Sequence, residues 1–197
     1  LDQTILSNFV KKIKNKFDDL KNFTTHERFV KKISKKTDLK HIAILDNDKK
    51  NYLSKLCEHH GSDKGYINFH RENLWPWSPH TYTNVYDNLF NHCRESVKLV
   101  FECGIGTTNE RISCNMSSGG KPGASLKVWK DYFSNAEIFG ADIDKSILFS
   151  ENRIKTFYVD QLDNNKIYAM WNSVNRENFD LIVDDGLHTY EAAHNFF

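Results

Sequence analysis

The feature that most constrains the fold of this chain is a series of four short apolar runs, separated by segments with helical spacing. Apolar runs of this length, bounded by turn signals, are typical of buried strands. The runs lie at 99–102, 137–143, 155–160 and 179–185. Strands that alternate with helices predict a parallel sheet with right-handed crossover connections. We therefore expect an α/β protein with a Rossmann-like, mostly parallel sheet and flanking helices.

Each of these runs ends in acidic residues at its carboxyl end. The acids are Glu102, Asp142, Asp160, Asp184 and Asp185. Ligands of open α/β sheets bind at the edge where the carboxyl ends of the strands meet. One strand-terminal acid is common, whereas four strands with the same ending predict a ligand site at that edge.

The first run leads into a Gly-x-Gly turn formed by Gly104 and Gly106. Glycines in such a turn let backbone N–H groups approach a ligand closely, because no Cβ intervenes. The carboxylate of Asp142, at the end of the next run, is placed to accept hydrogen bonds from ribose hydroxyls. The two features together predict a nucleoside site, although a lone Gly-x-Gly also occurs in ordinary strand–helix turns.

A dinucleotide is disfavoured as the ligand. Asn109 stands where the dinucleotide pattern requires its third glycine. Glu102 would repel a pyrophosphate but suits a cationic ligand such as S-adenosylmethionine. The interval between Glu102 and Asp142 is also much longer than the roughly 20 residues of a dinucleotide fingerprint. We therefore expect S-adenosylmethionine as the cofactor, with a nicotinamide-dependent oxidoreductase as the alternative.

The composition excludes some classes of partner. Lys+Arg 27 against Asp+Glu 26 gives a formal net charge of +1, which offers no general field for nucleic acid. No apolar run approaches the roughly 20 residues of a membrane helix, and no charged-then-apolar leader opens the sequence. The four cysteines are scattered without a C-x-x-C pair, as suits a reducing compartment. We expect a soluble, cytoplasmic protein with no nucleic-acid partner and no integral membrane segment.

Residues 1–60 are expected to form a helical N-terminal extension, followed by the cofactor-binding domain at 61–197. Ile5, Phe9 and Ile13 recur at helical spacing with lysines between them. Such a helix caps the main domain or pairs with another subunit; binding at a membrane surface is the alternative. Farther along, the helical spacing of Tyr82 and Tyr86 is more typical of a core face than of a pocket.

Six motifs occur in a fixed order along the chain. They are Gly61-Ser-Asp-Lys-Gly, His80-Thr-Tyr-Thr-Asn-Val-Tyr, Phe101-Glu-Cys-Gly-Ile-Gly, the segment from Gly120 to Phe133, Ile138-Phe-Gly-Ala-Asp-Ile and Asp184-Asp-Gly-Leu-His. With them the chain resembles the class I S-adenosylmethionine-dependent methyltransferases, and more narrowly the macrocin and mycinamicin sugar O-methyltransferases and their relatives in bacterial polysaccharide clusters. The resemblance begins at about residue 61.

The resemblance implies roles for particular residues. Contacts to the cofactor would come from Glu102, Gly104 and Gly106 on the methionyl side, Asp142 at the ribose, and Asp160 with Gln161 near the adenine. The second motif makes His80, Tyr82 and Tyr86 the candidates for contact with the acceptor substrate.

The last motif implies the chemistry. In the family it is associated with a divalent metal and with a histidine that takes the acceptor's proton. Asp184 and Asp185 offer the hard oxygen ligands that Mg²⁺ prefers, and Asp184 is also a catalytic candidate. His188 suits a general base, because its unperturbed pKa of roughly 6.5 lies near working pH. The alternatives are structural: Asp184 as a helix N-cap, and His188 as a hydrogen-bonding residue in the first helical turn.

The expected function is O-methylation of a sugar or sugar-like metabolite in surface polysaccharide biosynthesis. A phosphoramidate is an alternative acceptor. The family's sheet continues with three further strands, which we expect to be missing here. Its fourth strand would then be an exposed edge unless a second copy covered it, so a homo-oligomer is an open possibility. A cofactor-binding but catalytically incomplete protein is the alternative function.

Overall fold

The computed structural model describes residues 51–65 and 82–197. The chain divides into two compact units, 1–44 and 45–197, and all the described residues belong to the second. The amphipathic pattern predicted for the first 40 residues, and candidate substrate residue His80, lie outside the described residues. Within them, no helix is long and apolar enough to cross a membrane.

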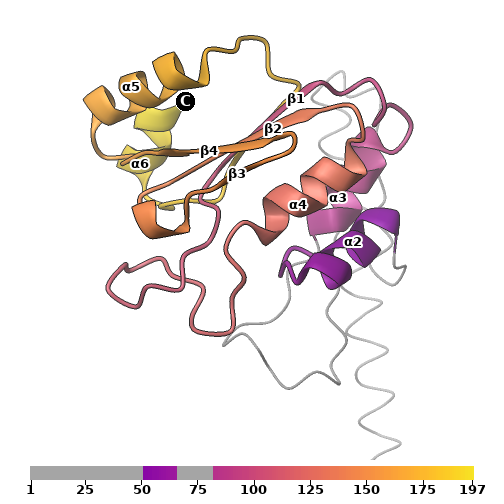
Figure 1. The fold of residues 1–197 in the computed structure, drawn as a ribbon, viewed down its shortest axis with the longest axis horizontal. Coiled ribbons are helices and arrows are strands. Elements are labelled where there is room, and N and C mark those ends of the chain that lie inside the picture. The colour runs from indigo at the N-terminus through magenta and orange to yellow at the C-terminus, as the bar shows by residue number, and fades with distance from the viewer. Residues whose placement is uncertain (1–50, 66–81) are drawn as a thin grey trace, which may run out of the picture. The chain divides into compact units, whose positions relative to one another are not determined.

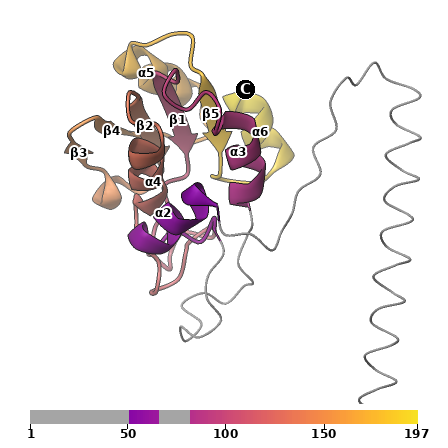
Figure 2. The ribbon, with the colours of Figure 1, turned by 90° about the vertical axis from the view of Figure 1, so that its right-hand side faces the viewer.

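The described residues form a five-stranded sheet with helices on both faces (Figures 1 and 2). Its order is β3-β4-β2-β1-β5. The strands are β1 (Leu99–Cys103), β2 (Glu137–Asp142), β3 (Ser150–Glu151), β4 (Ile154–Tyr158) and β5 (Leu181–Asp184). All neighbours pair in parallel except β3 and β4. The mostly parallel, Rossmann-like sheet predicted from the sequence is confirmed.

The helices precede, connect or follow these strands. They are α2 (Tyr52–His60), α3 (Tyr82–Phe90), α4 (Ala124–Tyr132), the 3₁₀ turn η1 (Lys145–Ile147), α5 (Asn164–Val174) and α6 (Tyr190–Phe196). Helix α4 connects β1 to β2, and α5 connects β4 to β5. Helices α2, α3 and α4 lie on one face of the sheet, and α5 and α6 on the other (Figure 1).

Burial of both faces follows from the alternation of side chains along the central strands. Val100 of β1 and Ile138 of β2 belong to the apolar cluster beneath α4. Phe101 and Phe139, one residue later in each strand, belong to the cluster beneath α5 and α6. This explains why the sequence of these strands reads as continuous apolar runs rather than as alternation.

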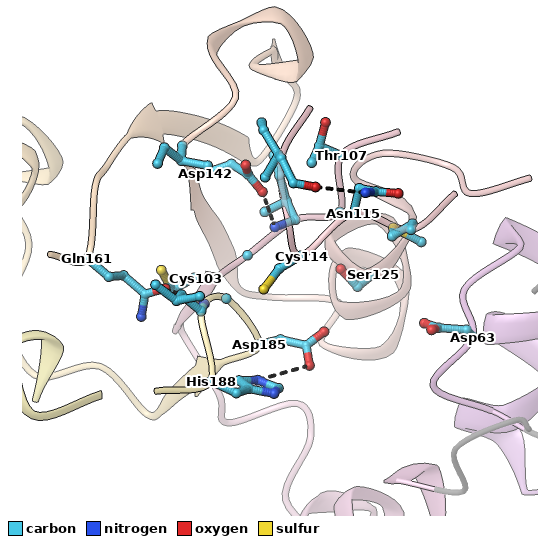
Figure 3. Close-up of a pocket in the computed structure, with 18 of the residues that line it drawn as sticks. Asp63, Cys103, Thr107, Cys114, Asn115, Ser125, Asp142, Gln161, Asp185 and His188 are labelled. Carbon is cyan, nitrogen blue, oxygen red and sulfur yellow. Dashed lines mark hydrogen bonds and ion pairs between the residues drawn. The ribbon is translucent and has the colours of Figure 1, made fainter. Parts of the chain in front are cut away.

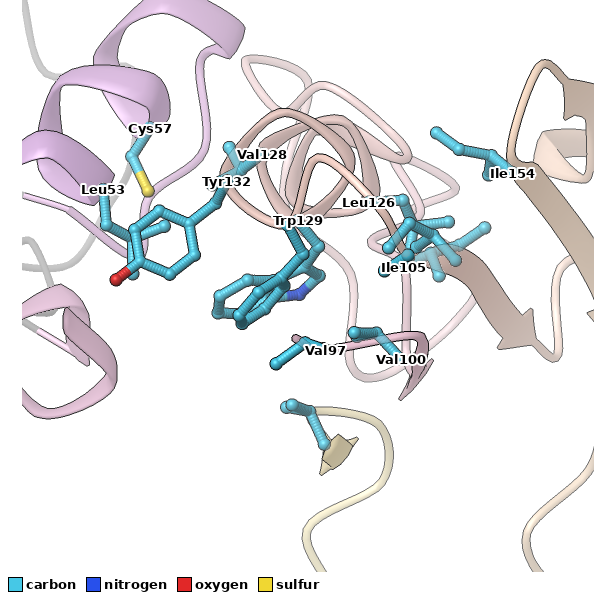
Figure 4. Packing of buried hydrophobic residues seen from close by; sticks show 14 residues of the cluster. Leu53, Cys57, Val97, Val100, Ile105, Leu126, Val128, Trp129, Tyr132 and Ile154 are labelled. Atoms are coloured by element: carbon cyan, nitrogen blue, oxygen red, sulfur yellow. The ribbon is translucent and has the colours of Figure 1, made fainter. Parts of the chain in front are cut away.

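The cluster on the α4 side holds the helical layer in place (Figure 4). Leu126 and Trp129 of α4 are almost fully buried against the sheet, and Leu53 and Cys57 of α2 join the same cluster. The sequence assigned α2 to the N-terminal extension, whereas in the structure α2 packs on α4. Its position matters for the site, because the loop that follows α2 leads to the carboxyl edge of the sheet.

Local signals explain where several helices begin and end. Asn51 caps α2 by accepting a hydrogen bond from the Ser54 N–H at 2.7 Å, and Gly61 ends the helix in the left-handed conformation. Thr189, not Asp184, is the N-cap of α6: its hydroxyl accepts from the Ala192 N–H. The alternative that Asp184 serves as a helix cap is therefore wrong, and His188 precedes the helix rather than lying in its first turn.

Candidate functional site

A cavity of about 380 Å³ lies at the carboxyl edge of the sheet, where the sequence predicted a ligand site. Its walls come from the ends of β1, β2, β4 and β5, from the loop after β1, and from residues 62–64 after α2. The predicted cofactor residues that line it are Gly104, Gly106, Asp142, Asp160 and Gln161. Glu102 does not line it.

The Gly-x-Gly turn has the backbone conformation that requires glycine. Gly104 and Gly106 have φ angles of 82° and 83°, in the left-handed region that L side chains rarely adopt. A Cβ on Gly104 would lie 2.3 Å from the carbonyl oxygen of Asp185, so the turn also packs directly against the loop after β5. The turn thus brings the ends of β1 and β5 together at the cavity.

Asp142 holds this turn from the neighbouring strand. Its Oδ2 accepts a hydrogen bond from the Ile105 N–H at 2.9 Å, and its Oδ1 accepts from the Asp144 N–H at 2.9 Å. Burial raises the pKa of the Asp142 carboxyl, and these two amide hydrogen bonds oppose that shift. Figure 3 shows the carboxylate at the cavity wall, bonded to the turn. Asp142 therefore shapes the turn and also lines the cavity.

The sequence reasoning did not identify a second polar link beside it. Asp144 accepts a 2.5 Å hydrogen bond from the Thr107 hydroxyl and further hydrogen bonds from the N–H and hydroxyl of Ser146. These bonds, first those from Ser146 and then that from Thr107, lower the pKa of the Asp144 carboxyl. They tie the loop after β2 to the loop after β1, and the acid-rich Asp142-Ile-Asp144 sequence is the only signal that pointed to them.

Gln161, after β4, links the predicted adenine side of the cavity to the last motif. Its Oε1 accepts from the Leu187 N–H at 2.7 Å, and its Nε2 donates to Asp184 Oδ1 at 3.0 Å. The same Asp184 oxygen accepts from the Gly186 N–H at 3.2 Å. Asp184 does not line the cavity. Its carboxylate instead accepts these two hydrogen bonds and so fixes the loop after β5.

Glu102 lies inside the protein rather than above the cofactor position. It occupies the same side of β1 as Val100, which faces α4, and it is fully buried. Its Oε2 accepts from Trp129 Nε1 at 3.0 Å, and its Oε1 lies 3.2 Å from Lys64 Nζ. Burial raises the pKa of the Glu102 carboxyl, and the charge of Lys64 opposes this shift.

Lys64 connects Glu102 to the last motif, since its ammonium also donates a hydrogen bond to Asp185 Oδ2. The lysine belongs to the motif Gly61-Ser-Asp-Lys-Gly, and the sequence alone predicts no role for it. The lysine comes from the loop after α2, 121 positions from Asp185 in the chain. No local pattern marks so distant a pairing.

Asp185 and His188 line the same cavity and lie side by side on the loop after β5 (Figure 3). His188 Nε2 is 4.0 Å from Asp185 Oδ1, and two thirds of the His188 side chain is exposed. An exposed imidazole beside a carboxylate can take a proton from a ligand in the cavity, because the carboxylate stabilises the imidazolium that forms.

The donor set for the predicted Mg²⁺ does not fit a preformed metal centre. Asp184 Oδ1 is taken up by Gln161 and Gly186, and Asp185 Oδ2 faces the Lys64 ammonium. Within residues 51–65 and 82–197, no group of three or more His, Cys, Asp or Glu side chains is arranged to hold a metal ion.

The two described substrate candidates differ in position. Tyr82, at the start of α3, lines the cavity and is exposed. Tyr86 lies one turn later and its ring packs edge-on against Trp129, with centroids 5.1 Å apart. Tyr86 therefore matches the core alternative raised by its helical spacing, and Tyr82 is the better placed of the two to contact an acceptor.

Comparison with known proteins agrees with this geometry. No family model matches the chain. The tetracenomycin rhamnosyl 2'-O-methyltransferase of Streptomyces olivaceus is 29% identical over 136 residues, which are 69% of this chain and 30% of that protein. The demethylmacrocin O-methyltransferase of Streptomyces fradiae is 31% identical over 61% of this chain and 28% of its own length. The chain thus spans about a third of these relatives.

The solved structures give the same result. The mycinamycin-pathway methyltransferase MycE, in complex with Mg and SAH, superposes with a TM-score of 0.56 and 29% identity over 76% of this chain and 35% of MycE. A second MycE structure also contains mycinamycin VI and superposes equally well. In sequence and fold, the described part of the chain is that of a class I S-adenosylmethionine-dependent methyltransferase related to the sugar O-methyltransferases.

Proposed function

We propose that this chain binds S-adenosylmethionine at the carboxyl edge of its sheet and takes part in methylating a sugar hydroxyl. The observation that carries the proposal is the cavity itself, which the left-handed Gly104–Gly106 turn, Asp142, Gln161, Asp185 and His188 all line. We assign the turn, Asp142 and Gln161 to the cofactor end of the site, and Asp185 with His188 to its acceptor end. The names of the relatives support a glycoside as the acceptor. Because the chain spans about a third of them, the activity of the whole protein is part of the proposal.

The carboxylates at the cavity suit a cationic cofactor. Asp142, Asp160 and Asp185 line it, and its lysines among the described residues are Lys64 and Lys121. Lys64 is already paired with Glu102 and Asp185, so Asp142 and Asp160 supply negative charge that Lys64 does not offset. Such negative charge favours a ligand that carries a sulfonium, and in the bound state that sulfonium supplies an electrophilic methyl group.

The roles of this chain's residues follow from that placement. The Gly104–Gly106 turn presents its backbone to the methionyl side, and Asp142 faces the ribose. At the acceptor end, the His188 imidazole would take the proton of the acceptor hydroxyl. The acceptor oxygen would receive the methyl group as the bond from the methyl carbon to sulfur breaks, and S-adenosylhomocysteine would leave. Asp185 stabilises the imidazolium from 4.0 Å. Tyr82 is placed to contact the acceptor.

Surface polysaccharide sugars are the narrower acceptor that we propose within this class, and phosphoramidates are the alternative. A cytoplasmic location and a small-molecule or sugar acceptor, with no nucleic-acid partner, belong to the same proposal. A protein that binds the cofactor without turnover is the second candidate function. Turnover of any acceptor in a panel of sugars and phosphoramidates by the purified chain would exclude it.

The first test is calorimetric titration of the chain with S-adenosylhomocysteine, with and without Mg²⁺. We expect micromolar binding. Asp142→Ala should weaken it at least tenfold, which is about 1.4 kcal/mol, because the variant loses both the ribose acceptor and the bond that holds Ile105. The matched control is Glu177→Ala, which removes an exposed carboxylate from the segment before β5, at the opposite edge of the sheet. No binding by a folded chain would overturn the proposal.

A further inference from the structure

Lys64 is the most deeply buried cation of the cavity wall, and the proposed methyl transfer does not use it. Only 7% of the residue is exposed. Its ammonium reaches two carboxylates on different strands: Glu102 of β1 at 3.2 Å, and Asp185 after β5 by a direct hydrogen bond. One side chain therefore joins the loop after α2 to the two strand ends that flank the proposed acceptor position.

Two carboxylates surround this lysine. The ammonium lies beside Glu102 and Asp185, whose negative charges favour its charged form. Glu102 Oε1 is buried, and the Lys64 ammonium lies 3.2 Å from it as the counter-charge of this carboxylate. A buried carboxylate without such a partner is strongly unfavourable.

The contacts of Asp185 show how the positive charge of Lys64 acts on the cavity wall. Asp185 Oδ2 is occupied by the Lys64 ammonium, and Oδ1 faces His188 Nε2 at 4.0 Å. A divalent ion binds through several oxygen ligands, and its charge would repel an ammonium that holds one of them. The lysine and a metal ion would therefore compete for Asp185 Oδ2.

We propose that Lys64 is the built-in cation of the acceptor end: it neutralises and orients Asp185, and it competes with a divalent metal for that carboxylate. This inference rests on the proposed function for the meaning of the site, but its test does not depend on turnover. Without the lysine, Glu102 and Asp185 would leave two negative charges facing one space, which is an attractive position for a divalent ion.

Titration of the whole chain with Mn²⁺, followed by the electron paramagnetic resonance signal of the free ion, tests this directly. We expect weak binding to the unaltered chain, and Lys64→Met should bind Mn²⁺ at least tenfold more tightly. The matched control is Lys166→Met, because Lys166 of α5 is exposed and does not line the cavity. This control should bind like the unaltered chain.

Two double variants complete the test. Lys64→Met with Asp185→Asn should lose the gained Mn²⁺ affinity, which would assign the gain to Asp185. Lys64→Met with Glu102→Gln removes the uncompensated buried carboxylate, so it keeps the experiment usable if Lys64→Met alone does not fold. It should still bind Mn²⁺ more tightly than Glu102→Gln alone.

Equal Mn²⁺ affinity in the presence and absence of Lys64 would overturn the proposal, as would tight binding by the unaltered chain that Asp185→Asn leaves unchanged. S-adenosylhomocysteine binding is measured in the same samples. Its absence in the folded, unaltered chain would overturn the proposed function while leaving the Mn²⁺ result readable.

Discussion

The two ends of the cavity are built in different ways. At the cofactor end, backbone amides and the buried Asp142 hold the Gly104–Gly106 turn, and the geometry is set by main-chain conformation. At the acceptor end, charged side chains do this work: Lys64 holds Asp185, and the exposed His188 lies beside it. The cofactor end thus resists substitution through sterics, whereas the acceptor end depends on a few charges.

The sharpest test of this contrast is His188→Ala. If His188 is the base, methyl transfer should fall by about 10²- to 10⁴-fold. Binding of S-adenosylhomocysteine and the melting temperature should stay near their original values, because the side chain is mostly exposed. Kinetics and calorimetry on the same preparation measure both. His194→Ala, an exposed histidine in α6, is the control, and equal losses in the two variants would contradict the assignment.

Among these variants, Lys64→Met should lower the free energy of unfolding most. Removing the lysine leaves Glu102 buried without its counter-charge, a change that typically costs about 3–5 kcal/mol of unfolding free energy. Lys130→Met is the matched control, since Lys130 forms an ion pair of 2.8 Å with Glu151 nearer the surface. Its loss should cost about 0–1 kcal/mol. Urea denaturation measures both. Similar losses of unfolding free energy would show that burial of the Lys64 ion pair does not increase its contribution to stability.

Gly104→Ala tests the steric character of the cofactor end. The added Cβ would meet the Asp185 carbonyl oxygen at 2.3 Å and would force alanine into a left-handed φ. Such backbone strain costs about 1–3 kcal/mol. The reverse change, Asn175→Gly at the left-handed C-cap of α5, should change stability much less. An unfolding midpoint for Gly104→Ala that matches the unaltered chain would mean that the turn relaxes freely.

The smallest expected effect is on the stability of the protein at low pH. The pKa of Asp144 is lowered in the folded protein by Ser146 and Thr107, so its contribution to stability is fully present above its ordinary pKa of 3.8 and is lost as the pH falls through the lower folded value. Thr107→Val should therefore show a weaker loss of melting temperature between pH 6 and pH 3. If the melting temperature of the variant falls with pH as in the unaltered chain, the Thr107 hydroxyl does not lower the pKa of Asp144.

The strands were predictable because burial on both faces leaves an apolar run that local sequence reveals. Predicted runs at 137–143 and 155–160 match β2 and β4 within two residues at each end. Strand β3 was not predicted, since Ser150 and Glu151 are both exposed and carry no apolar signal. Which helix α2 packs against was not readable either, because packing depends on contacts distant in sequence.

The site was predictable in location but less so in the direction of its side chains. Asp142 and Gln161 face the cavity as expected, whereas Glu102 lies on the α4 side of β1 and Asp184 bonds to Gln161 and Gly186. A strand-terminal acid points to one face or the other with a period of two, so a shift of one residue decides between ligand and core. The role of Lys64 could be recognised only from the fold, since both its partners are distant in sequence.

The contact between the Gly104 turn and the Asp185 backbone has a consequence for the order of events. At the position where a Cβ would stand, the two segments leave no room, so a ligand that shifts the turn must also shift the loop that carries His188. Occupancy of one end and affinity at the other are then thermodynamically linked, and that linkage acts equally in both directions. An acceptor that binds more tightly once the nucleoside is in place would therefore tighten the nucleoside by the same factor.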